Sequence, residues 1–92
     1  KRKRVCIISP EYERIRQYII NDLSRGLTIY NVKGGYSGED KVELEALLST
    51  DEFSDLMKFV NENEINAFIT AGNVSEVYGL WGDKNRRKHI SK

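Results

Sequence analysis

The sequence predicts an α+β domain of the order β-α-β-β-α-β, folded as a four-stranded antiparallel sheet with two helices on one face. Three observations lead to this fold class: four short segments rich in strand formers, two segments with apolar residues at helical spacing, and cap or turn residues between them. Right-handed crossovers leave few other ways to connect these elements. The arrangement is the ferredoxin-like βαββαβ sandwich.

The first half of the chain predicts a strand and a helix. Residues 4–9 form an apolar run of strand length. Ser9, Pro10 and Glu11 have the order of a helix start, with a capping hydroxyl, a first-turn proline and an acid near the positive end of the helix dipole. Gly26 is expected to end this helix in the left-handed conformation. Its apolar stripe is formed by Tyr12, Ile15, Ile19 and Leu23.

The second half predicts two strands, a helix and a last strand. Residues 27–33 and 41–49 are rich in strand formers, and in 41–49 apolar residues alternate with the outward-facing Glu43 and Glu45. Ser49 and Glu52 match the capping box of a helix that ends near Asn63. A short strand is expected at 67–71, followed by a loop or edge strand at 74–83.

Length and composition limit the possible functions. A chain of 92 residues, 39% of them hydrophobic, forms one domain with a modest core. One Cys and one His are too few for a zinc site or an internal disulfide, so neither a metal nor another cofactor is expected. No apolar stretch reaches about 18 residues, so no membrane span or signal peptide is expected in this sequence.

The net charge of +1 hides a segregation of charge. Residues 1–4 carry four cations and residues 84–92 carry five, whereas residues 5–83 carry six cations against fourteen carboxylates, a formal charge of −8. The acidic body repels phosphate, so no specific nucleic-acid partner is expected. The two basic segments have three possible roles: solvent-exposed charge without a partner, arms that bind nucleic acid, or contact with an anionic membrane. A cationic run before a domain is typical of the cytoplasmic end of a transmembrane helix.

We therefore expect a basic juxtamembrane linker at 1–4, a ferredoxin-like domain at 5–82 and a basic tail at 83–92. Two helices cannot cover both faces of the sheet, so Tyr30 and Leu47 are expected on an uncovered face. Small domains of this design use such a face, or an edge strand, to form homo-oligomers.

The glycine-rich segment 33–40 is the most unusual local feature. One interpretation is a ligand-binding loop, in which the glycines expose backbone amides to an anion and Tyr36 stacks on a planar ligand. The other is a wide hairpin loop, in which the glycines serve only the backbone conformation. The segment precedes a strand and lacks the spacing of known phosphate loops. The residues at issue are Gly34, Gly35, Tyr36, Ser37 and Gly38.

No catalytic residues are expected. Ser37 near Asp40 has no imidazole base beside it, because the single His lies in the basic C-terminal segment. Capping and the helix dipole account for the acids Asp51 and Glu52. Cys6 lies in an apolar run and is expected to be a small buried residue.

Four motifs in order resemble the cytosolic C-terminal domain of YitT-type bacterial multipass membrane proteins. The first is the strand entry RGLT at 25–28, and the second is the loop GGYSG at 34–38. The third is AFI at 67–69, and the last is VSEVYG at 74–79, which contains Glu76 and Gly79.

This resemblance implies a ferredoxin-like domain on the cytoplasmic side of a bacterial cell membrane, joined to the transmembrane part of its own chain and without established enzymatic activity. We expect a non-enzymatic regulatory or assembly domain. The alternative is a small-molecule or nucleotide sensor, in which the loop 34–38 lines one ligand cleft together with Glu76 and Gly79.

Overall fold

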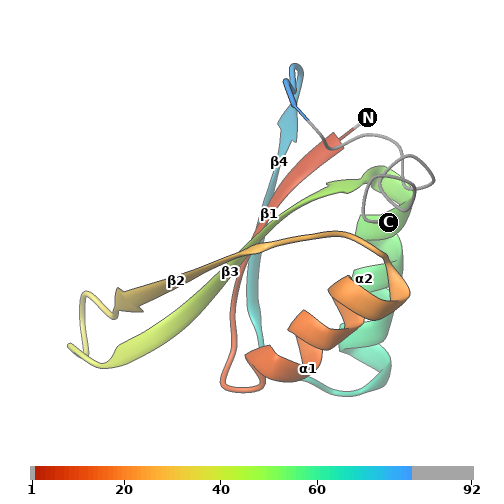
Figure 1. Ribbon diagram of the computed structural model, residues 1–92. Helices are drawn as coiled ribbons and strands as arrows, with labels where there is room; N and C mark the ends of the chain where they lie inside the picture. The colour runs from red at the N-terminus through yellow and green to blue at the C-terminus, as the bar shows by residue number, and fades with distance from the viewer. Residues whose placement is uncertain (1, 80–92) are drawn as a thin grey trace.

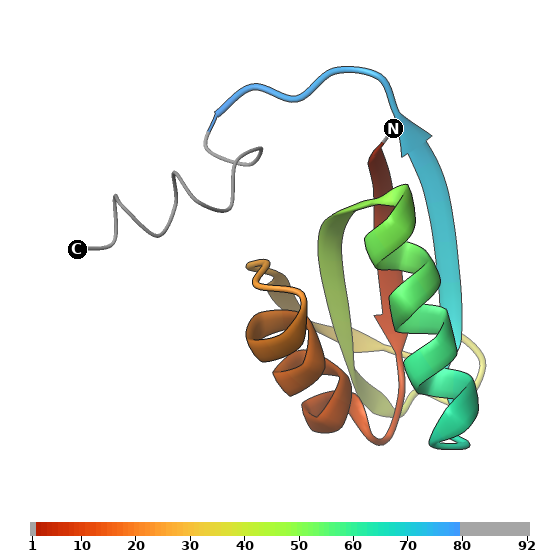
Figure 2. The same ribbon diagram turned by 90° about the vertical axis from the view of Figure 1, so that its right-hand side faces the viewer.

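The computed structural model describes residues 2–79 and confirms the βαββαβ order. The four strands pair antiparallel in the order β2-β3-β1-β4, and both helices lie on one face of the sheet (Figures 1 and 2). The expected tail at 83–92 lies outside the described residues. The elements are β1 (Arg2–Ile8), α1 (Tyr12–Gln17), the π-helical turn η1 (Tyr18–Asp22), β2 (Thr28–Lys33), β3 (Asp40–Ser49), α2 (Thr50–Glu62) and β4 (Phe68–Val74).

Strand β1 begins at Arg2, earlier than the expected residue 4, so the cations at 2–4 belong to the sheet and not to a separate linker. Their polar ends find partners on neighbouring elements. Lys3 Nζ donates to Asn73 Oδ1 at 3.0 Å and lies 5.9 Å from the centre of the Phe53 ring. These contacts exist only in the folded chain, which is why the run of cations alone predicted a juxtamembrane linker and not the start of a strand.

The first helix differs from expectation at both ends. Ser9 does not occupy the N-cap position, which falls on Glu11; instead its hydroxyl accepts from the Glu11 amide at 3.0 Å and donates to the Asn66 carbonyl at 2.6 Å. At the other end the helix widens into η1. The left-handed residue is Ser24, with φ +57°, and not Gly26.

The core lies between the sheet and the helices. It is built from the inward-facing residues of β1 and β3 and the apolar stripes of the helices. The capping box of α2 is present as expected: Ser49 Oγ accepts from the Glu52 amide, and the Glu52 carboxylate accepts from the Ser49 amide. The fully buried large side chains are Val5, Ile7, Ile15, Ile19, Leu44, Leu48 and Leu56.

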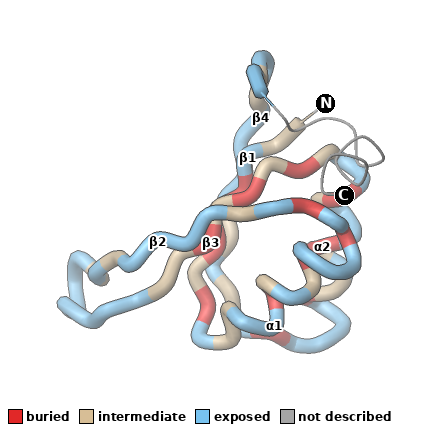
Figure 3. Tube along the Cα trace, in the orientation of Figure 1, coloured by how far each residue is buried: buried red, intermediate tan, exposed pale blue. Residues whose placement is uncertain are grey.

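Strands β2 and β3 continue as a hairpin beyond the helical layer (Figures 1 and 3). We call this hairpin, residues 28–45, the arm. Every residue of β2 except Val32 is exposed, so neither face of this strand is covered by the described chain. The sheet face opposite the helices, here called the open face, is likewise uncovered, as the sequence predicted for a sheet with two helices.

Candidate functional site

The strand register lays out the side chains of the open face in rows. At the end nearest the arm, Phe68 pairs with Ile8, which pairs in turn with Glu43. In the next row Cys6 lies beside Glu45. Cys6 is half-buried on this face, not inside the core as expected, because the alternation of β1 points Val5 and Ile7 inward and Cys6 outward. Burial raises the pKa of the Cys6 thiol.

Glu45 is the centre of a polar network on the open face. Its Oε2 accepts from Arg4 Nε at 2.5 Å. The Arg4 guanidinium first, and the Tyr30 hydroxyl second, hold the pKa of Glu45 below its ordinary value, and the Glu45 carboxylate raises the pKa of Tyr30. Side chains of β1, β3 and β2 thereby meet on the open face, where the sequence pattern had placed Glu45 and Tyr30 but had not placed Arg4.

Next to this network the open face is hollowed. The hollow has a volume of about 490 Å³ and lies between residues 25–28, which lead into β2, and residues 74–77, which follow β4. Arg4, Glu45 and Leu47 lie between these two rims. We call this feature the end hollow. It contains residues of the first and the last motif that the sequence analysis singled out.

Both rims of the end hollow are held by arginines. Arg25 is buried and donates through Nε to both carboxylate oxygens of Glu52 at 3.1 Å, which fixes the chain entering β2. Arg2 donates to the Ser75 carbonyl at 3.3 Å, which holds the chain leaving β4. No motif in the sequence marks Arg4, Glu45 or Arg2 as a site residue. The outward alternation of Glu45 was the one available signal.

The structure does not bring the predicted site residues together. Val74 pairs with Arg2, and Arg2 pairs with Ser49, so Glu76 lies at the Ser49 end of β3. The loop 34–38 follows the opposite end of that strand, near Asp40. Ten residues of strand at about 3.3 Å each separate the two ends by roughly 30 Å. One chain therefore does not line a single cleft with both groups.

Several backbone groups of the loop 34–38 form hydrogen bonds within the loop and with Glu39. The Gly34 amide donates to the Glu39 carbonyl and the Gly38 amide to the Gly34 carbonyl, each at 2.8 Å. Ser37 Oγ accepts from the Glu39 amide at 3.2 Å. The Tyr36 side chain is fully exposed. These bonds account for the turn, and a ligand-binding role for the loop stays a prediction.

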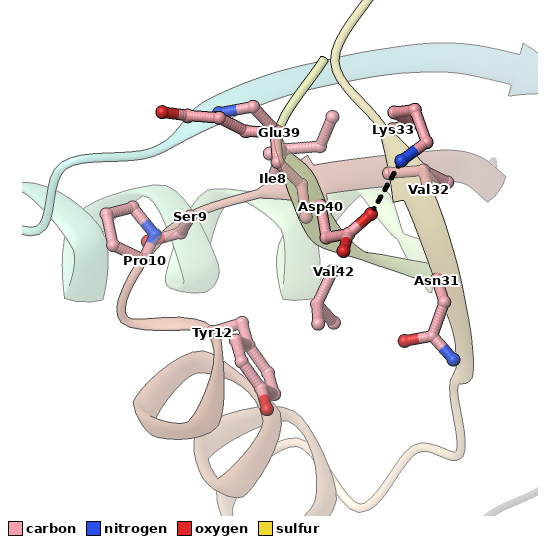
Figure 4. Close-up of a pocket in the computed structure, with 11 residues that line it drawn as sticks. Ile8, Ser9, Pro10, Tyr12, Asn31, Val32, Lys33, Glu39, Asp40 and Val42 are labelled. Carbon is pink, nitrogen blue, oxygen red and sulfur yellow. Dashed lines mark hydrogen bonds and ion pairs between the residues drawn. The ribbon is translucent and has the colours of Figure 1, made fainter. Parts of the chain in front are cut away.

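A second concavity, of about 800 Å³, lies between the arm and the start of α1. Figure 4 shows Tyr12 of α1 on one side and Asn31 of β2 on the other, with Val42 of β3 between them. Its charged groups are already paired, since Lys33 Nζ lies 3.0 Å from Asp40 Oδ1. This groove carries apolar surface and balanced charge. Within residues 2–79 no group of three or more metal-ligating side chains gathers.

Fold and sheet order define a class of protein, the ferredoxin-like α+β domains that include PII-like signalling proteins. A solved structure of Arabidopsis thaliana PII bound to citrate aligns with a TM-score of 0.69 and 19% identity, covering 87% of this chain and 83% of that one. A bacterial structure from Eubacterium ventriosum, titled as DUF2179, aligns with a TM-score of 0.67 and 17% identity, covering 78% of this chain and 99% of that one. At these identities the likeness concerns the fold.

The family is shown by sequence. Residues 25–79 match the family described as "Uncharacterized protein conserved in bacteria (DUF2179)", and the chain belongs to it. A protein from the cccA 5′ region of Bacillus sp. is 31% identical over 77 residues, which are 84% of this chain and 51% of that protein. The Bacillus subtilis membrane protein YxkD is 30% identical over 78 residues, which are 85% of this chain and 28% of that protein.

The resemblance to YitT-type membrane proteins is thus confirmed at the level of the family. The chain spans about half the length of the first of these relatives and less than a third of the second. Within the described residues no helix has the length and apolar character to cross a bilayer.

Proposed function

We propose that this chain is a non-catalytic regulatory domain of a bacterial membrane protein, lies on the cytoplasmic side, and assembles with further copies of itself. The observation that carries the assembly is strand β2 of the arm, which exposes an apolar side chain on each of its two faces. Ile29 is 48% exposed toward the helical side and Tyr30 is 43% exposed on the open face. An isolated two-stranded hairpin gains little stability in water, so a second surface that covers it has a physical role.

The matching surface is on the same chain. Phe68 is 67% exposed at the arm end of the open face, where it pairs across the strands with Ile8. We infer that the arm of one copy packs against the open face of another. Each copy then contributes its arm to one neighbour and its open face to another. Such a contact between two different surfaces is heterologous, and it forms a closed ring when the rotation between neighbouring copies closes on itself.

The membrane association is supported by the names of the relatives and by their greater length. The cations at 2–4, at the start of the first strand, fit the excess of Lys and Arg on the cytoplasmic side of transmembrane segments. A non-catalytic role is supported by the use already made of the candidate groups, since Ser37 closes a loop and Glu52 caps a helix.

Sedimentation of the isolated chain at about 100 μM tests the assembly, because a weak dimer or trimer forms in this range. The wild type is expected to be oligomeric, and Ile29→Lys and Phe68→Lys are each expected to shift it to monomer while circular dichroism stays unchanged. Ile20→Lys is the matched control, because Ile20 is 39% exposed but lies on η1, away from both surfaces. A monomeric wild type, or equal effects of all three variants, would overturn the assembly.

A further inference from the structure

The end hollow carries a cation with unused hydrogen-bonding capacity. Arg4 is anchored through Nε by Glu45, and within residues 2–79 its two terminal nitrogens have no partner. The bond to Glu45 uses Nε and leaves both terminal nitrogens for another acceptor. A guanidinium with both terminal nitrogens available can bind a carboxylate through two parallel hydrogen bonds.

A carboxylate lies on the opposite rim. Glu76 is exposed and lines the end hollow on the segment after β4, which Arg2 holds through the Ser75 carbonyl. Its Oε1 accepts from the Tyr78 hydroxyl at 3.2 Å, and among the described residues Oε2 accepts from none. An ammonium group satisfies such an oxygen by a charge-assisted hydrogen bond.

Apolar side chains line the space between these charges. Leu27 stands on one rim, Val74 and Val77 on the other, and Leu47 on β3 between them. A volume of about 490 Å³ is within the range of small-molecule sites. Two of the charges in the lining are already paired, Arg25 with Glu52 and Glu45 with Arg4 Nε. A ligand that is only an anion meets the Glu76 carboxylate here, and one that is only a cation meets the Arg4 guanidinium group.

We propose that the end hollow binds a small zwitterion of the α-amino-acid class with an apolar side chain. Its carboxylate lies on the terminal nitrogens of Arg4, its ammonium group lies on Glu76, and its side chain contacts Leu27, Leu47 and the two valines. The inference rests on the proposed regulatory role, for which it supplies the ligand class.

A titration of ¹⁵N-labelled chain with L-leucine, up to about 10 mM, tests this site by NMR. Saturable shifts are expected at the amides of residues 25–28 and 74–77. Two analogues of the same shape each remove one charge: leucine methyl ester lacks the carboxylate, and 4-methylpentanoate lacks the ammonium group. Each is expected to bind at least tenfold more weakly than leucine.

Two variants test which charged residue binds which charged group of the ligand. Glu76→Gln is expected to abolish the preference for leucine over 4-methylpentanoate, and Arg4→Gln the preference for leucine over its methyl ester. Arg16→Gln is the matched control, because Arg16 forms an exposed ion pair with Glu13 on α1 and is expected to leave all three affinities unchanged. No saturable shift in the two segments, or equal affinity for the three compounds, overturns the proposal. Sedimentation of the same samples reports assembly separately, so failure of the ligand site and failure of the assembly are distinct results.

Discussion

Arg25 and Glu52 form an ion pair inside the protein, with Arg25 Nε lying 3.1 Å from both carboxylate oxygens of Glu52. The two side chains are only 5% and 9% exposed. Glu52 also accepts from the Ser49 amide at 2.8 Å, so one carboxylate holds both the start of α2 and the chain that enters β2. The position of one rim of the end hollow therefore depends on a contact made in the core.

Removal of one member of this pair is expected to destabilise the protein strongly. Arg25→Met leaves the buried Glu52 carboxylate without its cation, and such changes cost about 3–5 kcal/mol of unfolding free energy. Urea denaturation measures this loss. Glu52→Gln, added to Arg25→Met, removes the uncompensated charge and keeps a residue that supports a capping box, so the double variant should be more stable than Arg25→Met. A loss below about 0.5 kcal/mol for Arg25→Met would contradict this role.

The left-handed Ser24 is a second position with a predicted effect. Its φ of +57° is unfavourable for a residue with a side chain, so Ser24→Gly should raise the unfolding free energy by up to about 1 kcal/mol. Ser54→Gly is the matched control, since Ser54 lies exposed inside α2, where glycine costs about 0.5–1 kcal/mol. Thermal unfolding of the two variants should therefore shift in opposite directions. A decrease for both would show that the Ser24 side chain contributes more than its backbone conformation costs.

Local chemistry made much of the fold predictable. The capping box at Ser49 and Glu52, and the alternation along β3, depend on residues close in sequence, and both are present as expected. The sheet order follows from the handedness of the crossovers.

Except at Cys6, where strand alternation decides the facing, the departures depend on contacts between distant residues. The wide turn η1 and the left-handed Ser24 precede Arg25, which reaches a partner 27 positions away. The cations at 2–4 join β1 because their partners lie on β3, β4 and the segment after it. The loop 34–38 and Glu76 were grouped by motif, whereas strand register places them at opposite ends of the sheet.

Gly38 is expected to be required by backbone conformation alone. Its φ is +74°, and a Cβ built on it meets nothing within 4 Å, so a substitution there is strained without being crowded. Gly38→Val should cost about 1–2 kcal/mol of stability, because β-branched residues tolerate this region worst. Gly35→Ala is the comparison, since Gly35 has open space around it and no positive φ. Equal melting temperatures for Gly38→Val and the wild type would show that the loop accommodates another turn.

The Glu45 network makes part of the stability depend on pH. Arg4 first, and Tyr30 second, hold the pKa of Glu45 below its ordinary value, so the folded protein stabilises the ionised carboxylate. A carboxyl with a lowered pKa contributes its stabilisation fully above the pKa of the unfolded chain, near 4.3, and loses it as pH falls through the pKa of the folded state. Glu45→Gln should therefore lower the unfolding free energy at pH 7 by about 1 kcal/mol, the upper range for a surface pair.

The same difference should shrink as pH falls below about 4.3, and it should vanish once pH has passed the lowered pKa of folded Glu45, where the protonated side chain resembles the glutamine. Urea denaturation of both proteins between pH 7 and about 3 measures this convergence. Glu13→Gln serves as the control, because Glu13 is 60% exposed in its pair with Arg16 and should show a smaller difference at every pH. A gap between wild type and Glu45→Gln that stays constant across this range would mean that the glutamine perturbs packing on the open face, and that the charge of Glu45 is not what joins the three strands.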